Sequence, residues 1–180
     1  MRLHAARRPA ASEHTPYQLE YVGRVPDGDV VETLINQADG MRLALAAVSE
    51  SAAAARPRPA EWSSKQVLGH LTEWERIFCH RALCFARSLP DELPGYDQDL
   101  LVAAADFDAR SWASLLAEYA AVRAATIMLF DGFHPIDWDR GGVASGARLT
   151  VRALAYIIAG HELHHVESLR EVYGLFGHSE

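Results

Sequence analysis

Three histidines stand at positions where helical periodicity calls for apolar side chains. His161 and His165 are four residues apart near the end of the chain, and His70 lies in an apolar segment far upstream. On a helix, a spacing of four places two rings about 40° apart on one side and one turn along the axis. Two imidazoles so placed can bind one metal ion, and a third from another helix would leave one coordination position open.

A lone histidine on an apolar face is more often a core residue with a satisfied hydrogen bond than a metal ligand. Three such rings without partners would each cost about 1–3 kcal/mol, whereas one cation satisfies all of them. We therefore expect His70, His161 and His165 to bind a divalent metal, for which zinc, nickel and copper are all suitable. The histidines without this context, which we expect at the surface or in loops, are His4, His14, His80, His134 and His178.

Residues 161–165 also satisfy the H-E-x-x-H string of zinc proteases, in which the glutamate activates water. The third ligand of the best-known zinc proteases lies downstream of that string, yet only fifteen residues follow His165. We therefore do not expect a protease. Glu162 is instead expected to be a flanking carboxylate that orients an imidazole or handles a proton, and His164 to be a flanking residue or a partner of a ligand.

Four segments with helical periodicity must position these side chains, and no segment shows a convincing strand pattern. They run approximately over residues 29–56, 64–88, 110–130 and 150–174. The caps Asp29 and Thr150 and the breaker Pro57 support these limits. Helices of roughly 20–26 residues are about 30–39 Å long, which suits an all-α four-helix bundle with inward-facing histidines.

The remaining segments divide the chain into an irregular N-terminal arm (1–26), the bundle (27–176) and a short tail (177–180). A long crossover joins the second and third helices, contains a short helix near 98–105, and is expected to lie over the site. The segment with Gly141, Gly142 and Gly146 is expected to be a loop. Four residues are candidates for contacts with a substrate at the mouth of the site, although ion-pair and turn roles suit them equally well: Arg76, Arg81, Tyr96 and Asp97.

Composition restricts the class of protein. The 180 residues are 49% hydrophobic and 23% charged, which is typical of a single globular domain. With 17 basic and 24 acidic residues the net charge is −7, so we expect no nucleic acid as partner. No apolar run approaches the ~20 residues of a membrane span, and no secretion signal is evident. We expect a cytoplasmic protein whose two cysteines, Cys79 and Cys84, are reduced.

Several segments together resemble the DinB-like superfamily, also described as YfiT-like metal-dependent hydrolases. They are WSSKQVLGHL at 62–71, LPGYDQD at 93–99 and VRALAYIIAGHELHH at 151–165, with Glu75-Arg76 and Arg81-Ala82-Leu83 between them. The resemblance extends from about Tyr17 to Tyr173. It implies a four-helix bundle, commonly a homodimer, in which His70, His161 and His165 bind nickel or zinc.

The resemblance also implies a class of activity. Characterised relatives include thiol-dependent S-transferases and isomerases that use mycothiol, bacillithiol or glutathione. The leading hypothesis is therefore a metal-dependent enzyme, a thiol S-transferase or a hydrolase, that activates a thiol or water against a small-molecule substrate. The alternative is a non-catalytic, metal-stabilised bundle with a role in stress response or metal binding, because fold alone does not determine a reaction.

Overall fold

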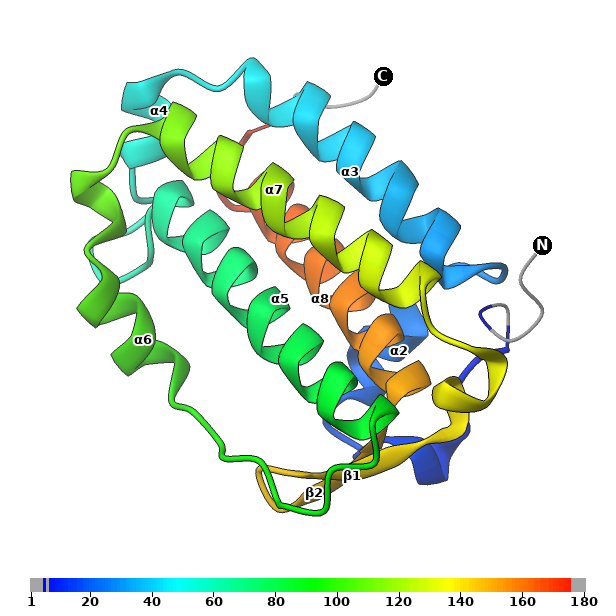
Figure 1. Cartoon of the computed structure of the whole chain (residues 1–180). Helices are drawn as coiled ribbons and strands as arrows, with labels where there is room; N and C mark the ends of the chain where they lie inside the picture. The colour runs from blue at the N-terminus through cyan, green and yellow to red at the C-terminus, as the bar shows by residue number, and fades with distance from the viewer. Residues whose placement is uncertain (1–4, 6, 176–180) are drawn as a thin grey trace.

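Four long helices form the body of the computed structural model, which describes Ala5 and residues 7–175. They are α3 (Val30–Ala46), α5 (Ser64–Ala86), α7 (Trp112–Asp131) and α8 (Val151–Glu171). Both α3 and α5 pack against α7 and α8, so the four helices close into a bundle (Figure 1). The predicted four-helix bundle is confirmed.

Polar caps fix where the long helices begin. Asp29 accepts a hydrogen bond from the N–H of Val31 at 2.9 Å, and Thr150 accepts one from Ala153 at 3.1 Å. At the start of α5, Ser63 and Gln66 bond each other's backbone N–H groups reciprocally, at 3.1 and 3.0 Å. Because a cap fixes the first helical residue, it also sets which residues face the core.

The first predicted helix is two helices in the structure. α3 ends at Ala46, and α4 (Glu50–Ala54) begins after a break. The Ser49 hydroxyl accepts a hydrogen bond from the N–H of Ala52 at 3.2 Å, so this side chain caps a new helix. Apolar residues at helical spacing continue to Val48, so the spacing alone predicts one long helix. The side chain of Ser49 competes with helix continuation, because it bonds a backbone N–H group.

The N-terminal arm is not irregular, because it contains η1 (Ala11–Glu13) and the helix α2 (Leu19–Arg24), which packs against α8. At their crossing, a Cβ on Gly160 would lie 1.9 Å from the carbonyl oxygen of Tyr21. Only glycine therefore permits this contact between the two backbones, which places Tyr21 beside the first histidine of α8. The predicted tail, 177–180, lies outside the described residues, as do His4 and His178.

The crossover contains the predicted short helix, α6 (Gln98–Ala105), which lies outside the bundle against α5 (Figure 1). Short 3-10 turns follow at η2 (Phe107–Ala109) and η3 (Pro135–Asp139). The segment expected to be a glycine-rich loop is a hairpin of β1 (Gly141–Ala144) and β2 (Ala147–Thr150), paired Gly141 to Thr150 and Ala144 to Ala147. Its turn residues have φ of +55° at Ser145 and +73° at Gly146, the left-handed conformation that tight hairpins require.

Among the described helices, α7 alone is long and apolar enough to cross a membrane. One such helix is weak evidence for a membrane span, because core helices of bundles meet the same criteria. Only 28% of the apolar window of α7 is buried, on the one face that carries Trp112, Leu115, Tyr119 and Phe130. Its burial is explained by packing against α3 and α5.

Candidate metal centre

The structure brings the three predicted histidines together. His70 lies in the first half of α5, and His161 and His165 lie one turn apart on α8. The Nε2 atom of His161 is 3.1 Å from that of His70 and 3.2 Å from that of His165. All three candidate ligand atoms lie within 4.8 Å of one another.

The two separations at His161 fit a metal ion. Imidazole nitrogens bind divalent zinc at about 2.0–2.1 Å, which places neighbouring ligand atoms about 2.8–3.4 Å apart for coordination angles near 90–110°. The two short separations at His161 fall in that range. Within the described part of the chain, the group of ligating side chains has these three members, so a bound ion would keep a position for a further ligand.

Burial keeps all three rings neutral, which is the form that binds metal. Desolvation lowers the pKa of His70 to about 4 and that of His165 to about 3. For His161, desolvation and the neighbouring histidines place the pKa well below its usual value. The lone pairs are therefore available at neutral pH without first losing a proton.

The trio faces the seam between α5 and α8 rather than the bundle axis, which corrects the expectation that the histidines point inward. The Tyr21 ring of α2 packs edge-on against His161, with centroids 5.3 Å apart. On the α5 side, Trp62 and Trp74 lie 5.0 and 6.2 Å from the His70 ring. Aromatic rings thus wall the centre on these two sides, while His165 stays partly exposed.

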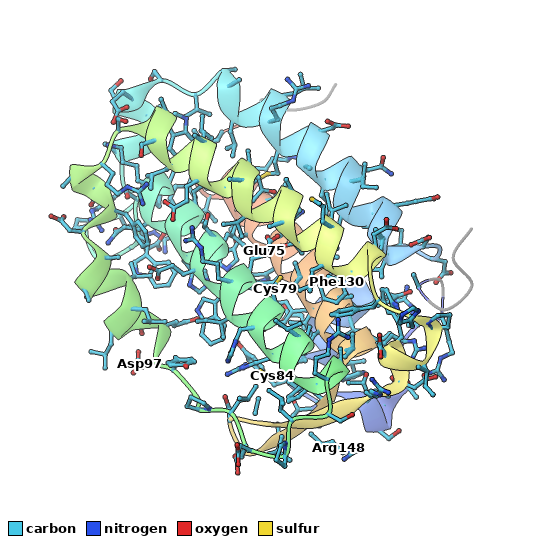
Figure 2. The ribbon with its side chains drawn as sticks, in the orientation of Figure 1. Glu75, Cys79, Cys84, Asp97, Phe130 and Arg148 are labelled. Carbon is cyan, nitrogen blue, oxygen red and sulfur yellow. The ribbon has the colours of Figure 1, made fainter. Side chains whose placement is uncertain are left out.

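The bundle axis holds a buried ionic network instead. Arg123 of α7 donates two hydrogen bonds to Glu75, at 2.7 and 2.8 Å, and one to Glu162 at 2.8 Å. Tyr119 donates a further hydrogen bond to Glu162. Figure 2 shows Glu75 in the space between α5 and α7. Neighbouring residues on a helix are rotated by about 100°. When the side chain of Glu162 points toward α7, the side chain of His161 therefore points away from α7.

This network corrects the expected position of Glu162. Its carboxylate is 2% exposed and bonds Arg123 and Tyr119 rather than an imidazole. Burial raises the pKa of Glu162, and the Arg123 charge opposes that rise. The glutamate of a zinc protease must instead be free to accept a proton from metal-bound water, so the H-E-x-x-H string has a structural explanation in this chain.

Sequence reasoning missed Arg123. The buried face of α7 comprises Trp112, Leu115, Tyr119, Arg123, Thr126 and Phe130, which follow one another at spacings of three and four. A stripe chosen by apolar residue type alone takes Val122 and Ile127 in place of Arg123 and Thr126. The signal was present in the spacing, because an arginine at a core position predicts a buried carboxylate partner.

His164 lies beside the trio, with its ring centroid 5.1 Å from that of His165, and both roles expected of it stay predictions. Its Nδ1 lies 3.4 Å from a carboxylate oxygen of Glu20, and its ring packs against Tyr21. It therefore joins α2 to α8 beside the trio. His14 lies in the loop after η1, as expected, although it is only 7% exposed; its Nδ1 lies 2.8 Å from the carbonyl oxygen of Thr15.

Two hollows lie beside the trio. A cleft of about 330 Å³ reaches His165 and is lined also by Trp62, Val67 and Tyr173. On the other side, a hollow of about 290 Å³ is lined by residues of α2, α5, α8 and the hairpin, including the rings that contact the histidines. Both volumes suit small molecules, near the lower end of ligand sites.

The four candidates for substrate contact separate in the structure. Arg81 lines the 290 Å³ hollow, and it also borders a smaller one of about 200 Å³ together with Arg76 and Tyr96. Arg76 forms an ion pair with Glu118 at 2.6 Å. Asp97 lies at the start of α6, outside the bundle (Figure 2). Its carboxylate accepts hydrogen bonds from two backbone N–H groups of that helix, at 2.8 and 3.1 Å, so Asp97 is a helix cap.

Comparison with known proteins gives one family and one solved structure. The profile of the DinB superfamily matches residues 34–169. The fold is similar to that of YfiT from Bacillus subtilis, with a TM-score of 0.69, 16% sequence identity, and coverage of 92% of this chain and 91% of that chain. That protein is described as a probable metal-dependent hydrolase with an unusual four-helix bundle topology. No curated protein sequence matches the chain.

Proposed function

Because the chain belongs to the DinB superfamily, we propose that its three convergent histidines hold a divalent metal ion and that the protein is a metal-dependent enzyme. The observation that supports this most directly is the convergence of one ring nitrogen from each of His70, His161 and His165 within 4.8 Å. YfiT, which shares the fold, is described as a probable metal-dependent hydrolase. Nickel or zinc suits an all-histidine site.

The chemistry would be the activation of a nucleophile. A divalent ion with an open position acts as a Lewis acid and lowers the pKa of a bound thiol or water. The role of the chain is to keep three neutral imidazoles fixed on two rigid helices and to surround them with the rings of Tyr21, Trp62 and Trp74. We propose two reaction classes, transfer to a low-molecular-weight thiol and hydrolysis.

The two hollows beside the trio favour an enzyme over the alternative of a non-catalytic, metal-stabilised bundle. A structural zinc site is closed by four protein ligands, whereas a catalytic site keeps a position for an exogenous molecule. Here three side chains converge, and a cleft of about 330 Å³ reaches His165. A small molecule is therefore the expected partner.

The test combines metal content with activity. Tag-free protein should carry one equivalent of divalent metal by native mass spectrometry. It should then accelerate conjugation of monochlorobimane to glutathione, mycothiol or bacillithiol, or hydrolyse a panel of ester and amide substrates. Stoichiometric metal with no activity in either assay would favour the non-catalytic alternative, and absence of metal would refute the proposal. The homodimer implied by the resemblance stays a prediction, which sedimentation equilibrium tests.

A further inference from the structure

Arg81 differs from the other arginines that the bundle buries. Arg123 pairs with Glu75 at 2.7 Å, and Arg152 pairs with Glu13 at 3.2 Å. Arg81 is only 4% exposed, yet it forms no ion pair with any carboxylate of the described residues. A buried cation without a counter-charge is unfavourable, so such a residue beside a cavity is a candidate for binding an anion.

The hydrogen bonds of Arg81 go to neutral groups. One terminal nitrogen donates to the carbonyl oxygen of Pro94 at 2.9 Å and to the hydroxyl of Ser145 at 3.0 Å. Its Nε is buried and has no hydrogen-bond partner among the described residues. Burial lowers the pKa of Arg81, which Tyr96 partly offsets. The guanidinium group therefore keeps unused donor capacity.

The surroundings of Arg81 connect it to the metal centre. Its guanidinium carbon lies 5.9 Å from the ring centroid of Trp74 and 6.0 Å from that of Phe78. The Phe78 ring is in turn 6.1 Å from the ring of His161. Arg81 is the only arginine, lysine, aspartate or glutamate among the described residues that line this hollow of about 290 Å³. One layer of aromatic rings thus separates a lone cation from the trio.

We propose that Arg81 binds the carboxylate of a small organic acid, and that such acids are the substrate class of this enzyme. The proposal rests on the proposed function, because the other end of the acid is taken to react at the metal centre. The planar fork of a guanidinium group matches a carboxylate. A single cation balances a single negative charge, and Trp74 and Phe78 offer an apolar wall for the body of the molecule.

A purely structural role for Arg81 makes a different prediction. Its two hydrogen bonds join the crossover at Pro94 to the hairpin at Ser145, so its replacement would reduce stability whether or not it binds an anion. A structural role gives no preference between an anion and a neutral molecule of the same shape. The test therefore measures charge selectivity rather than stability alone.

Benzoate and benzamide are suitable probes, because they share a shape and differ in charge. Binding to the zinc-loaded full chain would be measured by isothermal titration calorimetry for wild type, Arg81→Gln and Arg87→Gln. Arg87 is a matched control, since its side chain on the same segment is 55% exposed and the substitution changes the net charge equally. We expect benzoate to bind wild type and Arg87→Gln alike and Arg81→Gln at least about ten-fold more weakly, with benzamide weak throughout.

Two outcomes would overturn the proposal: equal benzoate affinity in wild type and Arg81→Gln, or benzamide binding wild type as tightly as benzoate. If Arg81→Gln fails to fold, nuclear Overhauser contacts decide, because benzoate on wild type must contact the ring protons of Trp74 and Phe78. Zinc content is measured in parallel. Wild type without zinc refutes the proposed function, whereas zinc-bound protein without charge selectivity refutes only the role of Arg81.

Discussion

His161→Ala should abolish metal binding, because His161 occupies the centre of the trio. Its Nε2 makes both of the short separations, 3.1 Å to His70 and 3.2 Å to His165. A metal that binds only the folded state stabilises it by about 2.7 kcal/mol at a concentration of 100 times its Kd. For a domain of this length, each kcal/mol raises Tm by about 2–4 °C, so zinc should raise the wild-type Tm by about 5–11 °C.

The assay is differential scanning calorimetry of tag-free protein, first with a chelator and then with zinc. Comparing each variant with its own chelated baseline separates metal binding from any cost of the substitution itself. His134→Ala is the control, because His134 is exposed and lies outside the trio. We expect the zinc-induced shift to vanish in His161→Ala and to persist in His134→Ala. A shift of the same size in both variants would refute the assignment of the trio.

Three further predictions follow from burial and packing. Burial lowers the pKa of His70 to about 4 and that of His165 to about 3. In the unfolded chain both histidines have the ordinary pKa near 6.5, so below that pH the unfolded chain binds protons that the folded protein does not. Metal-free protein should therefore lose stability to urea as the pH falls from about 6.5 toward 4, and a flat profile would contradict this. Arg123→Met leaves two buried carboxylates without a counter-charge, so urea titration should show a loss of about 3–5 kcal/mol; a loss near zero would contradict the network. Gly160→Ala forces the α2 backbone away and should cost about 1–3 kcal/mol in thermal unfolding, whereas Gly40→Ala, whose Cβ meets nothing within 4 Å, should be neutral or stabilising.

The fold was predictable where local signals agree with packing. Ser63 and Gln66 form the reciprocal cap that starts α5, and Thr150 starts α8 as expected. At Ser49 the local cap overrode a continuing apolar stripe, so one predicted helix became two. The hairpin was missed because β1 and β2 are only four residues each, too short for a clear alternation, although Gly146 marked the turn.

The candidate site was predictable in its members but not in its orientation. Periodicity places His161 and His165 on one face of α8, but it does not say which neighbouring element that face meets. The orientation of this face depends on two residues. Gly160 has no side chain, so α2 can pack beside the trio. Arg123 binds Glu162 at the bundle axis. Both are contacts between distant segments. Spacing places Arg123 at a core position of α7, but it does not identify the residue of another helix that Arg123 meets.

The placement of the trio between two hollows bears on how reactants would arrive. One opening reaches His165 beside Trp62, and the other is bounded by Tyr21 and Phe78 near His161. A molecule entering by one route would not have to pass a molecule entering by the other. If the proposed enzyme takes two reactants, they would occupy the two hollows together, and initial rates would give intersecting lines in double-reciprocal plots.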